Sequence, residues 1–446
     1  MATAAPPDLI SDQSDAVLGT IVSLLPTKDG CRTQALARRW RTIWRSAPLN
    51  LDISDDGSGR LPQKTISHIL SSHLGPVRRI SVGSHDTISK GGLSSRDVLT
   101  GVQELDLDLM YSHVLPSSAR PTLHVATFAR FGVPANLAAD FPRLARLKLF
   151  GITLTEDNLS AVLSGCPMLR SLSLEETAGS DRLRVSSPTL RTFSFRSPSD
   201  EQLGSFSSAV KVQELIVDDA PCLESFLLLY PQYGPATVRV VRAPKLHSLG
   251  YLSIVTPQLH LGTTVFQNMI ATSLTTTMPS VKILVLDQLG PDLDSVLDAL
   301  KCFPCVERLY VWMDSYVNWP QPAKNKKNPR KYALPGDPNE CLEFHLKKVV
   351  LKPYYGNGTE VDFVRFFVLN AKVLERIEFG LSSDYGVQWR GNQIIELQLE
   401  DKASRDVRFE FKSFSPSKCK NIKKGKSYVD PFEASFLDGY ATFWEV

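Results

Sequence analysis

The residues whose spacing comes nearest to a metal or redox site in this 446-residue chain are two histidines and two cysteines. His68 and His73 are five residues apart, whereas two ligands on one helix face need a spacing of four, and no glutamate completes an H-E-x-x-H pattern. Cys302 and Cys305 form a C-x-x-C pair that stands without a second pair. A zinc or redox site is one interpretation of that pair, and two buried apolar cysteines are the interpretation we favour. We therefore expect no metal site.

Glycine patterns that cradle phosphates do not occur in the sequence. There is no G-x-x-x-x-G-K-[ST] loop and no G-x-G-x-x-G that opens a helix. Lysine runs at 324–331 and 418–426 are candidates for nuclear-import or nucleic-acid patches, although solvated loops are the simpler interpretation. With 50 basic and 47 acidic residues, the chain offers no electrostatic reason to bind nucleic acid or membrane. We expect no cofactor and no active site.

The sequence also indicates in which cellular compartment the protein is expected. The N-terminus, "MATAAPPDLI", has neither the positive start nor the apolar core of a secretory signal. No run approaches the ~18 apolar residues that a membrane span needs. The seven cysteines are odd in number and scattered, which is not the pattern of a disulfide framework. We expect a reducing compartment, the cytoplasm or the nucleus, and no membrane.

The elements that position the remaining candidate residues begin with three short helices between residues 8 and 48. Apolar residues recur at spacings of one, three and four ahead of Pro26, which predicts an amphipathic helix. Pro26 ends this helix because its ring removes a hydrogen-bond donor. Thr27 is the predicted N-cap of a second helix, with Asp29 in its first turn. A third helix, basic on its other face, is predicted from the apolar residues Trp40, Ile43 and Trp44.

One phrase recurs in the central part of the chain: proline, any residue, Leu or Val, two residues, an apolar residue, one residue and another apolar residue. It begins at Pro142, Pro167, Pro188, Pro221, Pro244, Pro279 and Pro304. Shorter relatives without the proline begin at residues 102, 212, 346 and 374. Leu144 and Leu169 are 25 residues apart, and Leu169 and Leu190 are 21 apart.

A period of this length with an L-x-x-L-x-L core is the signature of leucine-rich repeats, each a short strand and a return segment. The leucines face the interior, and the residues between them line a concave surface. Return segments at 155–166 and 292–303 have helical spacing, whereas Val212 lies only 11 residues before Leu223. The expected fold class is α/β: a small N-terminal three-helix unit, then an irregular leucine-rich-repeat solenoid. Its curved, mostly parallel sheet lies on the concave side, with helices and loops on the convex side.

The C-terminal third contains an interruption and one further unit. Residues 318–340 are rich in Pro, Asn and Lys, which predicts an exposed loop. Between residues 341 and 381 the pattern predicts a strand, a Gly-Asn-Gly turn, an amphipathic helix and another strand. We interpret this segment as one more repeat-like unit that closes the end of the stack.

Taken together, these features resemble the plant F-box proteins that carry leucine-rich repeats and end in an FBD region. The resemblance rests on "LLPTKD" and "LARRWRTIW" near the N-terminus, on the repeats, and on the 341–381 segment, which looks like the FBD core. It implies an F-box at 8–54, leucine-rich repeats at 98–317, and an FBD-like repeat and cap at 341–410, with the exposed loop at 318–340. We expect the F-box to be a docking unit separate from the repeat core.

In that family the F-box docks on a Skp-type adaptor and through it on a cullin, while the repeats hold a protein for ubiquitination. The resemblance implies a substrate-recognition subunit of an SCF-type ubiquitin ligase. The implied adaptor-facing residues are Leu18, Ile21, Leu24, Leu25, Pro26, Leu36, Trp40 and Trp44. For Ile21, Leu36 and Trp40 the alternative is that they only hold the three helices together.

Two residues depart from the family pattern. The family normally has Leu-Pro just before the first helix, where this chain has Gln13 and Ser14. Loss of an anchoring leucine costs ~1–3 kcal/mol of interface energy. An alternative function is therefore a leucine-rich-repeat interaction scaffold whose weakened F-box does not deliver ubiquitin. The candidate contacts to the unknown protein target are side chains between the strand leucines: Arg146, Lys148, Arg170, Ser173, Lys282 and Arg308.

Overall fold

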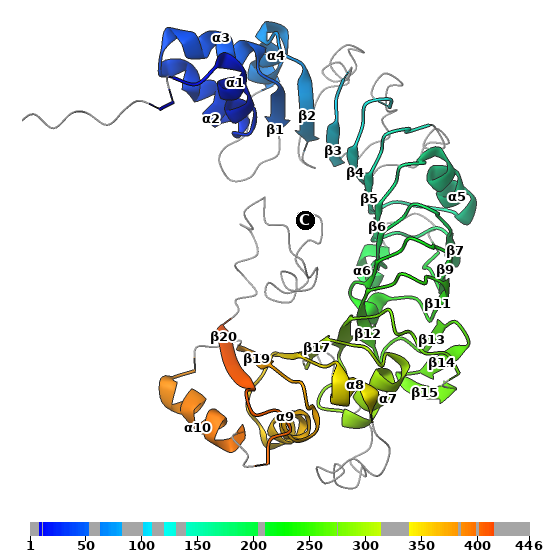
Figure 1. Ribbon diagram of the computed structural model, residues 1–446. Helices are drawn as coiled ribbons and strands as arrows, with labels where there is room; N and C mark the ends of the chain where they lie inside the picture. Colours follow the sequence, from blue (N-terminus) through cyan, green and yellow to red (C-terminus); the bar gives the residue numbers. More distant parts are fainter. Residues whose placement is uncertain are drawn as a thin grey trace, which may run out of the picture. The chain divides into compact units, whose positions relative to one another are not determined.

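The computed structural model divides the chain into two compact units, residues 1–177 and 178–446 (Figure 1). The described residues are 9–10, 12–52, 63–82, 101–108, 120–130, 140–203, 210–273, 275–313, 339–381, 385–397 and 401–413. The loop predicted at 318–340 lies outside them up to residue 338, as do both lysine runs.

The first unit begins with helices and continues as a parallel sheet. Its helices are α1 (Asp15–Ser23), α2 (Thr27–Arg32), the short 3-10 helix η1 (Thr33–Ala35), α3 (Arg38–Ser46), α4 (Gln63–Ser72) and α5 (Glu156–Gly165). Its strands are β1 (Leu49–Asp52), β2 (Val77–Val82), β3 (Glu104–Asp108), β4 (Val125–Ala129), β5 (Arg146–Phe150) and β6 (Ser171–Glu175). Each of these strands pairs in parallel with the next one in the chain.

The three helices predicted at the N-terminus are present as α1, α2 and α3. The N-cap predicted at Thr27 is wrong by one residue. Pro26 takes the N-cap position with an extended backbone at ψ 146°, so α2 begins at Thr27 itself. The Thr27 hydroxyl donates instead to the backbone carbonyl of Asn50, at 2.5 Å. Asp29 lies in the first turn of α2, as predicted.

The helices are joined to the repeats more closely than the sequence suggests. After α3 the chain passes directly into β1, and β1 pairs with β2 of the parallel sheet. The side-chain amide of Asn50 in β1 donates to the carbonyl of Ser23 at the end of α1. The backbone N–H of Leu74, just after α4, donates to the carbonyl of Arg45 in α3 at 2.8 Å. The expectation of a docking unit separate from the repeat core is therefore wrong, because the two share a strand.

In the second unit the repeat phrases form another run of parallel strands. These are β8 (Thr192–Arg196), β10 (Ser225–Leu228), β12 (Ser248–Ser253), β16 (Ile283–Asp287), β17 (Arg308–Trp312), β18 (Lys348–Lys352), β19 (Arg376–Leu381) and β20 (Arg408–Ser413), neighbours in that order. The phrase leucines point into the core, as Leu284 and Leu309 do with no exposed surface. The strands predicted from the repeat phrases are confirmed in both units.

A second sheet in this unit was not predicted. Its strands are β7 (Arg182–Val185), β9 (Glu214–Asp219), β11 (Thr237–Arg242), β13 (Gln258–Leu261), β14 (Thr264–Gln267) and β15 (Ile270–Ser273). We call the sheet that contains β8, β10, β12 and β16–β20 the main sheet. The phrase at Val212 leads into β9 of the second sheet, whereas the phrase at Leu223 leads into β10 of the main sheet. The two phrases lie only 11 residues apart because they form strands of two different sheets within one repeat, where the return segments are strands instead of helices.

The helices of the second unit begin and end as follows: α6 (Asp200–Leu203), the 3-10 helix η3 (Pro231–Tyr233), α7 (Leu293–Cys302), α8 (Glu340–Phe344), α9 (Gly358–Asn370) and α10 (Val387–Leu397). The helices predicted in two return segments are confirmed as α5 and α7. The predicted strand, turn, helix and strand at 341–381 correspond to β18, a turn with Gly356 at φ +72°, α9 and β19. A capping box of Asn357 and Glu360 begins α9.

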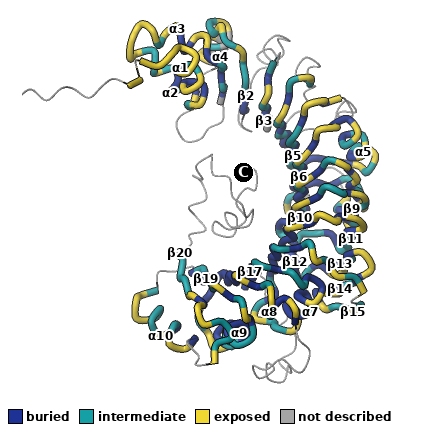
Figure 2. Tube along the Cα trace, viewed as in Figure 1, coloured by how far each residue is buried: buried dark blue, intermediate teal, exposed yellow. Residues whose placement is uncertain are grey.

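The fold class predicted from the repeats is confirmed as a mixed α/β leucine-rich-repeat architecture with mostly parallel strands. Figure 2 shows buried residues running along the main-sheet strands within each unit, with exposed residues on the helices. Among the described residues, no helix is both long enough and apolar enough to cross a membrane.

Candidate functional site

One face of α1 presents apolar side chains to solvent. Val17, Ile21 and Leu24 follow each other at spacings of four and three, and their exposed fractions are 43%, 46% and 68%. Leu36, just after η1, is 67% exposed. We call Val17, Ile21, Leu24 and Leu36 the exposed stripe. Large apolar side chains at this density on a small helical unit are typical of a protein-binding surface.

The predicted adaptor-facing residues divide into two groups. Leu18 has no exposed surface and Trp44 is 8% exposed, so both belong to the core of the helices and are not available to a partner. Pro26 is exposed, and Leu25 and Trp40 are half-buried. The prediction therefore fails for Leu18 and Trp44. On α1, Leu18 and Val22 form the buried stripe, one residue out of phase with the exposed one.

Trp44 is held in place by close contacts. Its ring meets the ring of His73 edge-on, with centroids 5.6 Å apart. On α2, a Cβ added at Gly30 would lie 2.5 Å from Cζ3 of Trp44, so the helices approach each other too closely for any larger residue at that position. This packing explains why a tryptophan with the family spacing is structural here.

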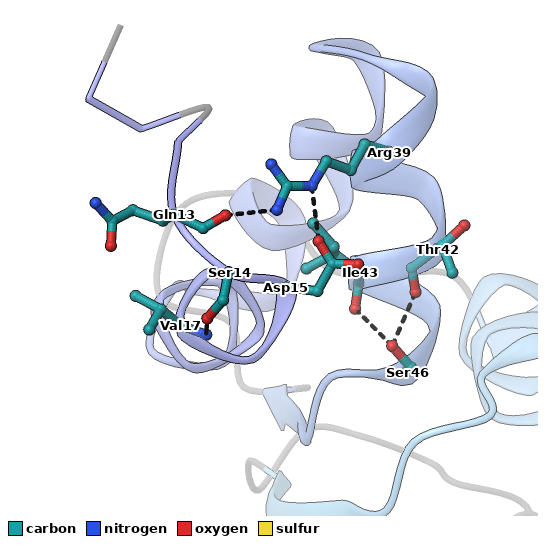
Figure 3. Close-up of polar contacts among 8 residues, drawn as sticks. All are labelled: Gln13, Ser14, Asp15, Val17, Arg39, Thr42, Ile43 and Ser46. Atoms are coloured by element: carbon teal, nitrogen blue, oxygen red, sulfur yellow. Dashed lines mark hydrogen bonds and ion pairs between the residues drawn. The ribbon is translucent and has the colours of Figure 1, made fainter.

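The two departures from the family pattern lie where α1 begins (Figure 3). The Ser14 hydroxyl accepts a hydrogen bond from the Val17 N–H at 3.4 Å, and so caps the helix. The Arg39 guanidinium donates to the Gln13 carbonyl and pairs with the Asp15 carboxylate at 2.7 Å. The start of α1 is therefore ordered by polar contacts to α3. What the chain lacks is an apolar side chain at position 13, where Gln13 is exposed.

His73 makes this part of the fold sensitive to pH. Burial lowers its pKa from the ordinary 6.5 and outweighs its hydrogen bond to Ala47, which raises it. Nε2 lies 2.7 Å from the Ala47 carbonyl, which only accepts, so Nε2 carries the hydrogen. Protonation would therefore add an N–H at Nδ1, which is buried and has no hydrogen-bond partner among the described residues.

We expect the free energy of unfolding of the chain to fall as pH drops from 7 to 5. The unfolded chain, with a histidine pKa near 6.5, binds a proton that folded His73 resists, so stability is present above that pH and is lost below it. Urea unfolding followed by tryptophan fluorescence at several pH values measures this. In His73→Gln the same drop in pH should produce a smaller loss, and an identical pH dependence in the two proteins would contradict the assignment.

In the first unit, the face opposite the buried leucines carries three of the predicted target contacts, Arg146, Lys148 and Ser173, whereas Arg170 lies just before β6. Lys148 Nζ pairs with Glu175 at 2.8 Å, and the Ser173 hydroxyl donates to the same carboxylate at 3.2 Å. Ser173 has no exposed surface, so the prediction that it contacts a target is wrong: its hydroxyl is used within the sheet. Arg170 is exposed, and Arg146 and Lys148 are half-buried.

In the second unit, Lys282 and Arg308 are both half-buried beside a cluster that the prediction missed. We call it the face cluster, because its members lie between the strand leucines, on the face opposite the core. Val285, Tyr310 and Val350 are direct register partners in β16, β17 and β18. The signal was present in the repeat phrases, where these positions hold apolar residues instead of polar ones. The buried members of the cluster are Leu227, Leu229, Tyr251, Ile283, Val285, Tyr310, Trp312 and Val350, with Tyr230 packed against them.

Charged residues border the face cluster. Lys348 Nζ lies 5.6 Å from the centroid of Tyr310, and Lys352 Nζ lies 5.3 Å from that of Trp312. Glu378 accepts ion pairs from Lys348 and Lys412, each at 3.0 Å. Burial raises the pKa of Glu378, but these two ammonium groups outweigh burial and hold the pKa below its usual value. Glu378 is therefore ionised at neutral pH and organises the basic residues around it.

The cysteine pair does not have the features of a metal or redox site. Burial raises the pKa of the Cys302 thiol to about 12, which leaves it protonated at neutral pH. Cys305 is half-buried at the start of the next repeat phrase. Within the described residues, no group of three or more His, Cys, Asp or Glu side chains is arranged to hold a metal ion.

Comparison with known proteins supplies a family context. Residues 93–311 match a model of the LRR repeats of FBD-associated F-box protein At5g56370, and residues 335–379 match the FBD model. The chain is 26% identical over 446 residues to an Arabidopsis thaliana protein described as FBD-associated F-box protein At3g50710, covering 89% of this chain and 98% of that one.

Two further Arabidopsis thaliana relatives match different lengths of the chain. F-box/FBD/LRR-repeat protein At2g04230 is 25% identical over 435 residues, which cover 83% of this chain and 88% of the relative. F-box/LRR-repeat protein At4g14103 is 31% identical over 214 residues, which cover 42% of this chain and 55% of the relative. The two family models thus match the repeats and the C-terminal unit.

Proposed function

Because this chain belongs to the plant F-box proteins with leucine-rich repeats and an FBD region, we propose that it is the substrate-recognition subunit of an SCF-type ubiquitin ligase. Its F-box binds a Skp-type adaptor, and through it a cullin. The repeats bind the protein to be ubiquitinated. The chain itself is not an enzyme: it acts by raising the effective concentration of the target near a ubiquitin-charged enzyme.

The observation that carries this proposal is the exposed stripe. Ile21 and Leu24 project from α1 while their neighbours Leu18 and Val22 fill the core. Core packing and partner binding are therefore assigned to two different stripes of one helix. The exposed stripe does not contribute to packing between the helices. A surface of this kind buries apolar area only when a partner covers it.

A second candidate function is an interaction scaffold that does not deliver ubiquitin, and Gln13 and Ser14 motivate it. A double variant, Gln13→Leu with Ser14→Pro, separates the two. The backbone at Ser14 already has φ −64°, the angle that a proline ring imposes, so the variant fits without a change of backbone. Its cost is the capping bond to Val17, which is long at 3.4 Å.

We expect the wild-type chain to bind a purified Skp-type adaptor and the double variant to bind it more tightly, by about tenfold or more, since a buried leucine adds ~1.5 kcal/mol or more. Surface plasmon resonance with immobilised adaptor measures both. If only the variant binds, the scaffold function is the correct one. If neither binds, the substrate-receptor function is wrong.

A receptor of this kind acts in the cytoplasm, the nucleus or both. Fluorescence imaging of the full chain fused to a fluorescent protein, with the adaptor imaged in the same cells, tests this location. Confinement to a compartment without the adaptor would contradict the proposed function.

A further inference from the structure

The last strand of the main sheet has a free edge. β20 pairs in parallel with β19, and among the described residues no strand pairs with its other edge (Figure 1). The Arg408 N–H donates to the Glu375 carbonyl at 3.0 Å, on the β19 side. Successive residues of a strand direct their backbone N–H and C=O groups to opposite edges, so those of Phe409 and Phe411 point to the free edge.

The apolar side chains of β20 lack the cover that the previous strand has. Ile377 and Phe379 in β19 have no exposed surface, whereas their register partners Phe409 and Phe411 in β20 are only half-buried. The Phe411 ring stacks on that of Phe379, with centroids 4.8 Å apart, so it continues the row of core side chains. In a stack of repeats each unit is covered by the next one, and the terminal unit needs a cap or a partner.

The charges on the other face of β20 indicate the chemistry of that partner. Arg408 and Glu410 each lie in register with a residue of the same sign in β19, Arg376 and Glu378, and like charges placed opposite each other are destabilising. Arg408 is exposed, and within the described part of the chain its side chain makes no ion pair. The ion pairs of Glu410 with Arg376 and Lys412 are long, at 3.7 and 3.5 Å. A strand that offers a carboxylate to Arg408 and a cation to Glu410 complements this edge.

A second copy of β20 offers both. In an antiparallel pair with a two-fold axis at Phe409, Arg408 of each copy lies opposite the partner's Glu410, and each Phe409 N–H donates to the other copy's Phe409 carbonyl. Val407, just before β20, then lies opposite the partner's Phe411. An axis at Glu410 would instead place two glutamates opposite each other, and an axis at Phe411 would leave Arg408 opposite no residue of the strand. The charges therefore favour one register.

We propose that two copies of this chain associate through β20, in an antiparallel pair with its two-fold axis at Phe409, so that the main sheet of one copy continues into that of the other. Two short strands bury less than the ~1,000 Å² of a permanent interface, so the association is reversible, with a dissociation constant of about 1–100 μM. The contact goes beyond the proposed function and does not involve α1, so its failure and the failure of that function are separate results.

Sedimentation equilibrium of the purified full chain, without adaptor, tests the proposal. Between about 1 and 200 μM we expect the average mass to rise from that of one chain toward that of two. The single variants Arg408→Glu and Glu410→Arg should each raise the dissociation constant at least ~30-fold, because like charges then meet across the two-fold axis. An equimolar mixture of the two variants should form a one-to-one heterodimer with about the wild-type affinity, because every facing pair is again of opposite sign.

Neither exchange should unfold the chain, since each places a charge opposite in sign to that of its register partner in β19. Circular dichroism and urea unfolding check this. Arg170→Glu, at an exposed arginine of the first unit, is the matched control and should associate as the wild type does. A wild type that stays monomeric over the whole range would overturn the proposal. Association retained by either single variant, or a mixture of the two variants that stays monomeric, would overturn it as well.

Discussion

Replacement of Leu24 by aspartate should abolish adaptor binding while leaving the chain folded. Leu24 is 68% exposed at the end of α1, so a charge there meets water in the free protein. In the proposed complex the adaptor covers this position, and an unpaired carboxylate there is costly. We expect the dissociation constant for a Skp-type adaptor to rise at least ~30-fold, the equivalent of a hot-spot residue at ~2 kcal/mol. Ile21→Asp should act in the same direction.

The matched control is Ile395→Asp on α10, which is exposed to a similar degree, at 72%, in the second unit. It introduces the same charge at an apolar surface position away from the exposed stripe. Circular dichroism and urea unfolding should show all three proteins to be as stable as the wild type. If Leu24→Asp binds the adaptor normally, the exposed stripe is not the docking surface.

Replacement of Leu18 by alanine should destabilise the protein, although Leu18 is adjacent in sequence to the exposed stripe. Leu18 has no exposed surface, and removal of a buried leucine side chain costs about 2–5 kcal/mol through lost burial and the cavity left behind. Urea unfolding followed by tryptophan fluorescence gives the loss, and Trp44 lies in the same helical core.

Val17→Ala is the control for that prediction, because Val17 precedes Leu18 and points outward. Its effect on the free energy of unfolding should stay within about 0.5 kcal/mol, as is usual for surface positions. Equal destabilisation by the two variants would show that the assignment of the two stripes is wrong.

The repeats were predictable because their physical requirement is local. Each strand must bury a leucine at alternate positions, so the phrase around Leu147 or Leu309 marks its strand without knowledge of the neighbours. The second sheet was not predictable in the same way. A short segment such as β11 alternates between apolar and polar residues whether or not it forms a strand that pairs with a neighbour, so its sequence does not reveal the sheet. The pairing of β9 with β11 depends on strands that are distant in the sequence.

The region of the proposed docking surface was predictable from the sequence, but the division of its residues between core and surface was not. Two apolar stripes run along α1, and the sequence alone does not say whether Leu18 or Val17 faces the core, because that choice depends on where α3 packs. The face cluster was missed for a related reason: a repeat pattern predicts that residues between the strand leucines line a concave surface, and it does not say that Tyr310 and Trp312 are buried there. Their burial follows from contacts beyond the strand that carries them.

The most direct test of the account is the affinity of the purified full chain for a purified Skp-type adaptor, measured by isothermal titration calorimetry. The account predicts saturable one-to-one binding with a dissociation constant below about 10 μM, which the Leu24→Asp variant loses and Ile395→Asp retains. Absence of binding by the folded wild-type chain, or equal binding by both variants, would contradict the central claim that the exposed stripe of α1 joins this protein to a ubiquitin ligase.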